Sequence, residues 1–437
     1  MSNITTIPGS TVDWTDALAS YFDKQFPNTV FDLDTAVDLF AGPGGWDEGA
    51  RILGSRLGNV DLHKGILGFE FEPNAVATAR AAGHARVYGD LAAVNPAFFK
   101  APGLIASPPC QGFSPAGKGR GREDFDLLLE AIGRIRTYVR TEGADADFSP
   151  EAVILWLANH IADPKSALIL EPLRWVIRMA EQPRWLAFEQ VKTCLPIWEA
   201  MAALLRDLGY SVWTGLVHSE EYGVPQTRTR AVLLGSLDKD VSGGPTATHG
   251  KYNPRRDRDA QRVEAIEAGL LPWVTMAEAL GWADDTFTHM GDVYNSKGCI
   301  RRGDAPAPTM TSSMDNGNFR SFHAADIEHE GLRSRIRKSD GPTTEVEGDT
   351  SWVYNRPSVT VVGSFRPDVA AAPGYRKPGD GPRQKAPGSV RLQQVEQGVL
   401  QSFPADYPWQ GSESVKFQQA GNAVPCLMAA ALVEAVL

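Results

Sequence analysis

Short apolar runs recur along the chain, and many are followed by a glycine turn, an acidic residue or a stretch with apolar positions at helical spacing. Runs of this length are typical of buried parallel strands. The predicted strands are 35–40, 65–69, 85–88, 104–105, 185–188, 210–217 and 231–234. The predicted helices cover 73–82, 123–140, 150–161, 196–208 and the C-terminal residues to 437, and two more begin at 47 and 163. The segment 390–403 is amphipathic. This alternation predicts an α/β fold with a mostly parallel sheet.

Glycines and acids stand at the ends of the first three predicted strands. The phrases are Ala41–Gly42–Pro43–Gly44–Gly45, Glu70–Phe71 and Asp90–Leu91. The carboxyl ends of parallel strands meet at one edge of a sheet and bind ligands there, so we expect a nucleotide-type pocket. The acid would accept hydrogen bonds from a ribose, and the aromatic ring would lie against an adenine. The glycine spacing departs from G-x-G-x-x-G at Asp47, which argues against a dinucleotide-dependent oxidoreductase.

A cysteine follows the fourth predicted strand, in the phrase Ser107–Pro108–Pro109–Cys110. Tandem prolines fix the backbone and donate no hydrogen bond, so they end the strand and present the next side chain rigidly. A thiol at such a position suits a nucleophile. A single cysteine is more often structural than catalytic, however, and this phrase alone does not decide between the two.

Composition narrows the class of protein. The 437 residues carry a net charge of −10, and the four cysteines (110, 194, 299 and 426) have neither disulfide nor zinc spacing. We therefore expect no metal. The N-terminus lacks a signal-peptide pattern and no later segment has the pattern of a membrane span, which predicts a soluble, cytoplasmic protein with no membrane partner. Two basic clusters, 118–122 and 251–262, are either solvated faces or nucleic-acid contacts.

The pattern changes after residue 237, where glycine, proline and charge increase and periodicity weakens as far as about 352. We expect a discontinuous larger domain, 1–236 and 390–437, with a helical insertion at 119–162. Residues 237–389 would form a smaller, irregular domain and the connection back.

In order and over nearly its whole length, the chain resembles the cytosine-5 DNA methyltransferases. The phrases that carry the resemblance are Asp38–Gly45, Glu70–Phe71, Asp90–Leu91, Pro109–Cys110–Gln111, Glu189–Gln190–Val191, Gln226–Arg230 and Gly421–Pro425. The resemblance implies a Rossmann-like domain that binds S-adenosylmethionine, a smaller target-recognition domain, and duplex DNA as partner. It also implies a monomeric prokaryotic or phage enzyme, with a cognate restriction endonuclease as one candidate partner.

The resemblance also implies residue roles. Cys110 would add as thiolate to C6 of a flipped-out cytosine, Glu189 would assist at N3, and Arg228 and Arg230 would hold the base and its phosphate. The implied cofactor-binding residues are Phe40, Ala41, Gly42, Gly44, Gly45, Glu70, Phe71, Asp90, Leu91, Pro109, Asn422 and Val424. The implied DNA-binding residues are Gln111, Ser114, Lys118, Arg120, Arg122, Gln226, Arg255 and Arg256.

Several alternatives stay open at this point. Glu189 and Arg228 could form a buried ion pair, and Asn422 could be a helix cap. Gln190 replaces the family's usual Asn, and the phrases around Thr309 and Thr360 both resemble the penultimate family motif. An RNA cytosine methyltransferase and a catalytically silent DNA-binding homologue are the alternative functions. The recognised DNA sequence is not predicted.

Overall fold

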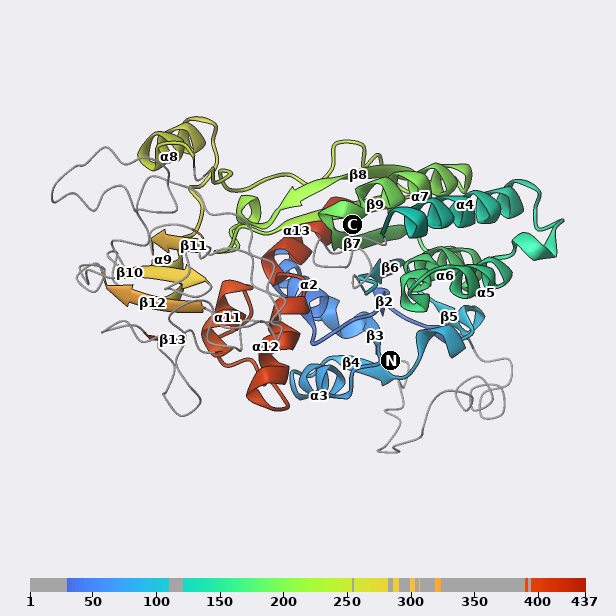
Figure 1. The fold of residues 1–437 in the computed structure, drawn as a ribbon, viewed down its shortest axis with the longest axis horizontal. Coiled ribbons are helices and arrows are strands. Elements are labelled where there is room, and N and C mark those ends of the chain that lie inside the picture. Colours follow the sequence, from blue (N-terminus) through green and yellow to red (C-terminus); the bar gives the residue numbers. More distant parts are fainter. Residues whose placement is uncertain are drawn as a thin grey trace, which may run out of the picture.

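The computed structural model describes residues 30–109, 121–253, 255–281, 286–290, 299–302, 306, 319–323, 390–391 and 394–437. The described chain contains a large α/β layer structure and a smaller antiparallel sheet, with α11 and α12 between them in the view of Figure 1. The phrases around Thr309 and Thr360 lie outside the described residues, apart from Pro306.

A seven-stranded sheet in the order β4-β3-β2-β6-β7-β9-β8 forms the centre of the larger part. Its strands are β2 (Ala36–Leu39), β3 (Ile66–Glu70), β4 (Ala85–Tyr88), β6 (Gly103–Ala106), β7 (Trp185–Val191), β8 (Ser211–His218) and β9 (Thr229–Ser236). All neighbouring pairs are parallel except the two that involve β9. A short parallel pair, β1 (Phe31–Asp32) and β5 (Phe99–Lys100), stands apart. The predicted α/β class with a mostly parallel sheet is confirmed.

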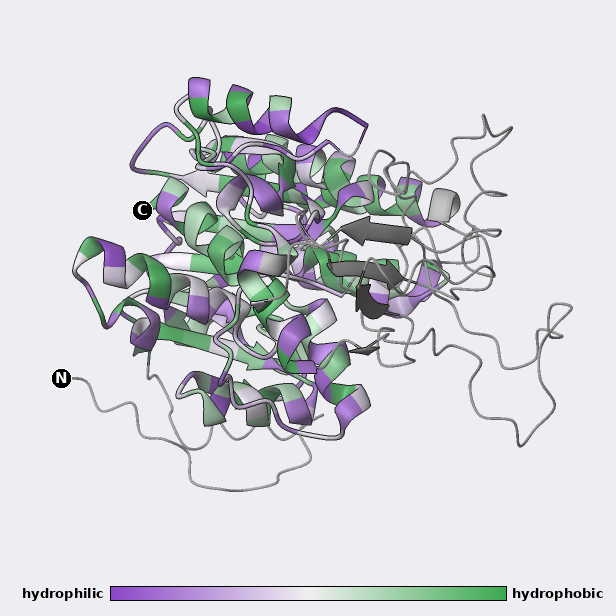
Figure 2. Cartoon of the chain, turned by 90° about the vertical axis from the view of Figure 1, so that its left-hand side faces the viewer, coloured by the Kyte–Doolittle hydropathy of each residue, from purple (hydrophilic) through white to green (hydrophobic). Residues whose placement is uncertain are grey.

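Helices cover both faces of this sheet because successive strand side chains point to opposite sides. Ala36 and Ile105 pack against α2 (Gly45–Leu57) and α13 (Cys426–Val436), while Val37 and Leu104 face a second core. The second core is closed by α4 (Gly121–Arg140), α5 (Pro150–His160), α6 (Glu171–Arg178) and α7 (Leu195–Asp207). A further helix, α3 (Pro73–Ala81), connects β3 to β4. Apolar residues accordingly concentrate in the strands and the inward helix faces (Figure 2).

The predicted helical insertion contributes to the core. Leu128, Ile132 and Ile135 of α4, and Val153 and Leu157 of α5, are all buried in the second core. Burying a side chain of this kind stabilises the fold by about 1.5–3 kcal/mol. These two helices therefore pack against the sheet, which favours the packing role over DNA contact for this segment.

Two predicted segments differ in detail. The segment that opens at Asp163 begins as a 3-10 helix, η5 (Pro164–Leu170), and becomes α6 only at Glu171, where Pro172 suits a first helical turn. The segment 390–403 divides into a two-residue strand, β13 (Val390–Arg391), and the short helix α11 (Gln394–Leu400).

The C-terminal segment forms α12 (Glu413–Asn422) and α13, separated by the extended residues Ala423 and Pro425. By length and composition, Glu413–Val436 could cross a membrane, which corrects the prediction that no segment has that pattern. However, 72% of its apolar window is buried inside the protein, as expected of a core helix.

The described residues of the smaller part include regular elements, and the predicted irregular domain stays a prediction. It contains α8 (Arg258–Glu267), α9 (Met276–Leu280) and an antiparallel sheet in the order β11-β10-β12-β13. Its longer strands are β10 (Thr286–Met290), β11 (Cys299–Arg302) and β12 (Phe319–His323). The division at 237 stays a prediction, but the next residues lie along the larger part. Val241 is buried in the α2–α13 core, and the amides of Thr248 and His249 donate to the Glu221 carbonyl at 2.9 Å.

Candidate active site

One edge of the central sheet collects most of the predicted site residues. The carboxyl ends of β2, β3, β4, β6 and β7 lie there because these strands are parallel. The start of β9, with Arg230, joins the same edge because β9 runs antiparallel to β7. The structure thus brings together the glycine turn, Glu70, Pro109 and the Glu189–Gln190 phrase, as expected for ligand binding in an α/β sheet.

The glycine turn between β2 and α2 is packed against the C-terminal segment at Gly44 and Gly45, whereas the space beside Gly42 is open. A Cβ on Gly44 would stand 2.6 Å from the Tyr407 hydroxyl, and one on Gly45 would stand 2.2 Å from the Val424 carbonyl. A Cβ on Gly42 would meet nothing within 4 Å. Phe40, Gly42 and Gly44 all have positive φ. The C-terminal segment therefore supports the back of the turn, while Gly42 leaves room for a ligand to approach the backbone.

A buried cluster of charged side chains packs against the same turn. Arg86 of β4 donates to both carboxylate oxygens of Asp47 at 3.0 and 2.5 Å. Burial opposes ionisation of Asp47, but Arg86 outweighs it and lowers the pKa of that carboxyl. Burial and the nearby Asp47 raise the pKa of Asp38 well above its usual value. Next to them, the His84 ring lies 2.9 Å from the Glu48 carboxylate.

Glu70 stands where a ribose-binding acid is expected. Its Oε1 accepts from the amides of Phe71 and Glu72 at 2.8 and 2.7 Å, and its Oε2 accepts from the Gly42 amide at 2.8 Å. A carboxylate has about four acceptor positions, so about one remains for a ligand hydroxyl.

The residues that follow β3 and β4 suit the binding of an adenine. The Phe71 ring is 61% exposed and stacks on Tyr88, with centroids 6.2 Å apart. Asp90 caps the short helix η2 (Leu91–Ala93) by accepting from the Ala92 amide at 2.9 Å, and Leu91 is buried. An exposed aromatic ring, an acid with remaining acceptor capacity and an open glycine turn fit the adenosine part of S-adenosylmethionine. Of the remaining predicted cofactor residues, Val424 contacts the turn, whereas Asn422 is exposed at the end of α12.

The strand tip before Cys110 is anchored on three sides. The Ser107 amide donates to the Leu39 carbonyl at 3.1 Å, and the Trp46 indole donates to the Ser107 hydroxyl at 2.9 Å. The Gln190 amide donates to the Pro108 carbonyl at 2.5 Å, two residues before the cysteine. The longer side chain that replaces the usual Asn therefore still reaches the phrase that precedes Cys110.

The cysteine and the loop after it are not described. Cys110, Gln111, Ser114, Lys118 and Arg120 lie outside the described residues, as does the side chain of Arg122. Their predicted roles stay predictions.

Glu189 pairs with Arg230 at the active edge. Nε of Arg230 lies 2.7 Å from Oε1 of Glu189, and the two side chains are 14% and 9% exposed. The contact is an ion pair without hydrogen-bond alignment, so the buried Oε1 has no hydrogen-bond partner among the described residues. The ion pair considered from the sequence thus exists, but its arginine is Arg230 and not Arg228.

Gln226 and Arg228, which precede Arg230 in the phrase Gln226–Arg230, point into the protein interior. Gln226 is fully buried, and its amide donates to the Leu400 carbonyl and to Oε1 of Gln401 at 3.2 and 2.9 Å. Arg228 is 3% exposed and donates to the Gly421 carbonyl at 3.0 Å. The DNA contact predicted for Gln226 stays a prediction. Both side chains tie the start of β9 to the C-terminal segment.

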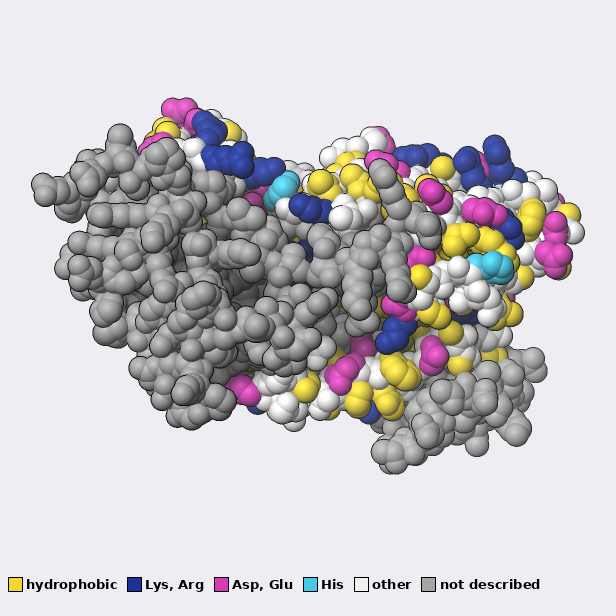
Figure 3. Space-filling model, in the orientation of Figure 1, with side chains coloured by type: hydrophobic (Ala, Val, Ile, Leu, Met, Phe, Trp, Pro, Cys, Tyr) yellow, Lys and Arg dark blue, Asp and Glu magenta, His cyan; other side chains and the backbone are white. Residues whose placement is uncertain are grey.

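Arg255 and Arg256 lie where a DNA contact is feasible. Both are exposed just before α8, and Lys and Arg side chains gather over this helix at the upper left of Figure 3. Arg256 pairs with Glu264 at 2.5 Å, but exposed pairs of this kind are weak. Their role in DNA binding stays a prediction.

Sequence reasoning missed the residues that support the site from a distance. Trp46, Arg86 and Tyr407 hold the glycine turn or the cysteine phrase through contacts far along the chain. One signal was available, since a lone arginine inside the strand Ala85–Tyr88 is unusual unless it is paired.

Comparison with known proteins gives a family. The model of the C-5 cytosine-specific DNA methylase family matches residues 35–138 and 157–437. The unmatched residues 139–156 fall inside the predicted insertion 119–162, whereas most of α4 matches the family.

The relatives agree with this match. The chain is 27% identical to the type II methyltransferase M1.HphI of Haemophilus parahaemolyticus over 421 residues, covering 92% of this chain and 86% of that one. It is 25% identical to the putative type II methyltransferase M.OihORF3336P of Oceanobacillus iheyensis, covering 96% and 97%. Among solved structures, the S. pombe Dnmt2 methyltransferase has a TM-score of 0.49 at 13% identity, covering 92% of this chain and 97% of that one. The chain belongs to the C-5 cytosine-specific DNA methylase family and is a DNA (cytosine-5) methyltransferase.

Proposed function

We propose that this enzyme methylates C5 of a cytosine that is flipped out of duplex DNA, through a covalent bond between the Cys110 sulfur and C6. The observation that supports this most directly is the Glu189 carboxylate. Its Oε1 is buried without a hydrogen-bond partner among the described residues, at the strand edge that also carries the cysteine phrase. Arg230 pairs with this oxygen at 2.7 Å without a hydrogen bond, so the oxygen can still take part in a hydrogen bond with a ligand.

The residues for the methyl donor lie beside it. The Gly42 backbone, Glu70, Phe71, Asp90 and Leu91 would hold S-adenosylmethionine by its amino acid, ribose and adenine parts, in keeping with the family. When bound, this cofactor supplies a methyl group on a positively charged sulfur.

Cys110, Glu189 and Arg230 have different roles in the proposed reaction. The Cys110 thiolate adds to C6, which forms the S–C6 bond and moves electron density toward N3. Glu189 donates a proton or hydrogen bond at N3 as that charge develops, and Arg230 keeps Glu189 in place. After C5 has gained its methyl group, a base removes the C5 proton, the thiolate leaves C6, and any proton taken up at N3 returns to Glu189. These steps restore the cysteine and the acid.

The family and the geometry support the DNA substrate and the cellular setting that we propose. A cytosine inside a duplex cannot reach a buried strand edge, so the nucleotide must leave the stack. The exposed arginines before α8 would contact phosphates. We further propose that the enzyme acts as a cytoplasmic monomer beside a cognate restriction endonuclease, since its relatives are named type II methyltransferases.

Methyl transfer from tritiated S-adenosylmethionine tests this proposal. Wild type and Cys110→Ser are each incubated with duplex DNA of mixed sequence and with structured RNA. We expect label at C5 of cytosine in DNA with wild type alone. Label on RNA instead would favour the RNA methyltransferase, and cofactor binding without transfer to either would favour a silent binding protein.

A further inference from the structure

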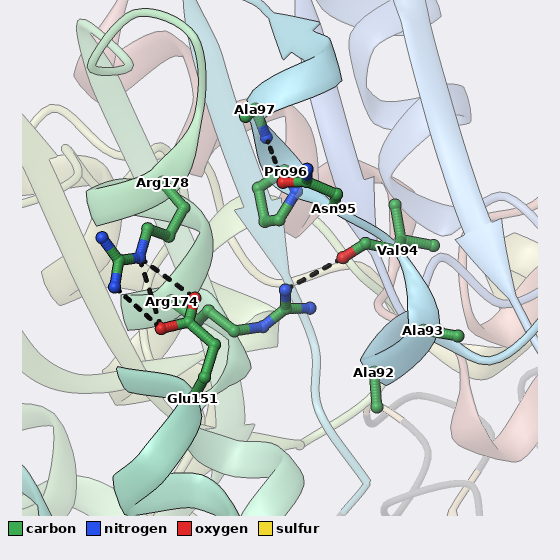
Figure 4. A pocket seen from close by; sticks show the side chains of 9 residues that line it. All are labelled: Ala92, Ala93, Val94, Asn95, Pro96, Ala97, Glu151, Arg174 and Arg178. Carbon is green, nitrogen blue, oxygen red and sulfur yellow. Dashed lines mark hydrogen bonds and ion pairs between the residues drawn. The ribbon is translucent and has the colours of Figure 1, made fainter. Parts of the chain in front are cut away.

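Arg174 of α6 is a buried arginine that the proposed chemistry does not use. Its side chain is 7% exposed. Nη1 donates to the Val94 carbonyl at 2.9 Å and Nη2 donates to the Leu91 carbonyl at 3.0 Å. Nε donates to Glu171 at 2.8 Å, and that carboxylate is itself buried. Figure 4 shows the guanidinium reaching from α6 to the loop that follows β4.

This loop carries the predicted adenine contacts. It begins at Asp90 and Leu91 and includes η2, in which the Asp90 side chain accepts from the Ala92 amide and the Val94 amide donates to the Leu91 carbonyl at 3.1 Å. The side chains of Leu91 and Val94 enter the core. If Arg174 were removed, the Val94 carbonyl would lose its described partner and the Leu91 carbonyl would keep only the Val94 amide. An unpaired buried carbonyl is strongly unfavourable.

The loop has few contacts on the side that faces away from the core. A cavity of about 360 Å³ lies against it, lined by residues 92–97 together with Glu151, Arg174 and Arg178. The lining side chains from the loop are mostly small (Figure 4). The loop is therefore held from one side by Arg174, and without that contact it has room to move into the cavity.

We infer that Arg174 is a positioning residue for the methyl donor: it fixes Asp90 and Leu91 and so sets the affinity for S-adenosylmethionine, not the rate of the chemical step. The inference rests on the proposed cofactor role of Asp90 and Leu91. A planar guanidinium can hold two carbonyls at once, and lysine cannot reproduce that geometry.

Arg178 supplies a matched control on the same helix. It lines the same cavity and also pairs with an acid, since its Nε donates to Glu151 at 3.0 Å. Its Nη1 donates to the Tyr138 hydroxyl at 3.0 Å. These partners lie on α5 and α4, so Arg178→Gln removes the same charge from α6 without touching the contacts to residues 90–94.

The test is calorimetric titration of S-adenosylmethionine, without DNA, into wild type, Arg174→Lys, Arg174→Gln and Arg178→Gln, followed by steady-state kinetics. We expect both Arg174 variants to bind about tenfold more weakly, with KM for the cofactor raised by a similar factor and kcat within about twofold of wild type. Arg178→Gln should bind within about twofold of wild type. Circular dichroism checks folding, and Arg174→Lys keeps the test valid if Arg174→Gln does not fold.

Three results would overturn the inference. The first is folded Arg174 variants that bind the cofactor like wild type, the second is an Arg178→Gln variant whose binding is weakened as much, and the third is a fall in kcat with unchanged cofactor binding. If wild type itself fails to bind S-adenosylmethionine, the proposed function fails first, and this outcome is distinguishable because it does not depend on any variant.

Discussion

Two buried arginine–carboxylate pairs flank the active edge, and they are built differently. Arg86 and Asp47 lie beneath the glycine turn, both side chains are fully buried, and both carboxylate oxygens accept hydrogen bonds. Arg230 and Glu189 stand at the strand ends, are 14% and 9% exposed, and make a single close contact that leaves Oε1 without a hydrogen bond.

The difference indicates that the Arg86–Asp47 pair stabilises the fold, whereas the Arg230–Glu189 pair takes part in the reaction. A fully satisfied buried pair holds its surroundings in one arrangement, because any change strands a charge. A partly satisfied pair at an open edge retains capacity for a substrate, and its polar groups can respond to charge that develops in a reaction. Loss of the first pair should therefore affect folding, and loss of the second should affect turnover.

The largest effect should come from Glu189→Gln. We expect kcat to fall by about 10²–10⁴-fold, because the amide cannot supply a proton at N3. The thermal midpoint should fall less than it does when the fully buried Arg86–Asp47 pair is broken, because Glu189→Gln removes an ion pair with the partly exposed Arg230 but no hydrogen bond of Oε1. Single-turnover methylation and calorimetric melting measure the two quantities. A variant with wild-type turnover would remove Glu189 from the mechanism.

Arg86→Met should show the opposite pattern. Stranding the buried Asp47 carboxylate should lower the free energy of unfolding by about 3–5 kcal/mol. The double variant Arg86→Met with Asp47→Leu should recover part of this loss, because it removes both charges. Urea unfolding is the measurement. Unchanged stability in the single variant would mean that the pair does not brace the turn.

The smallest effect concerns His218, at the active-edge end of β8. Its Nε2 lies 2.8 Å from the Lys251 ammonium, and burial, with a further contribution from Lys251, lowers the pKa of this histidine to about 4. Because the pKa is lowered on folding, the unfolded chain binds a proton first as pH falls. Stability should thus be complete above about pH 6.5 and decrease toward pH 4.

The ring is partly solvated, so the loss should be about 1–2 kcal/mol. His218→Gln should remove that part of the pH dependence. Urea unfolding of both proteins at several pH values between 4 and 7.5 would show it, and identical pH profiles would contradict the prediction.

The strands and the cofactor phrases were within reach of the sequence because their signals are local. An apolar run followed by glycines, or by an acid and an aromatic residue, specifies both the strand and the group at its end, as at Gly42 and Glu70. Strand β4 was predicted with the bounds that the structure shows.

The long-range pairings were out of reach. Arg228 and Arg230 are two residues apart in one phrase, and only the register of β9 on β7 decides which one meets Glu189. The contacts of Arg174 and Gln226 join residues 80 or more positions apart. The antiparallel sheet β10–β13 was missed because its short strands are separated by long connections, which weaken the alternating pattern.

The most direct test of covalent catalysis is a trapping experiment. Duplex DNA of mixed sequence, with 5-fluorocytosine in place of cytosine, is incubated with the enzyme and S-adenosylmethionine and resolved on a denaturing gel. Fluorine at C5 cannot leave as a proton does, so the sulfur–C6 bond persists. We predict a slowly migrating protein–DNA species with wild type and none with Cys110→Ser. A wild-type enzyme that methylates ordinary DNA but forms no such species would contradict the covalent mechanism.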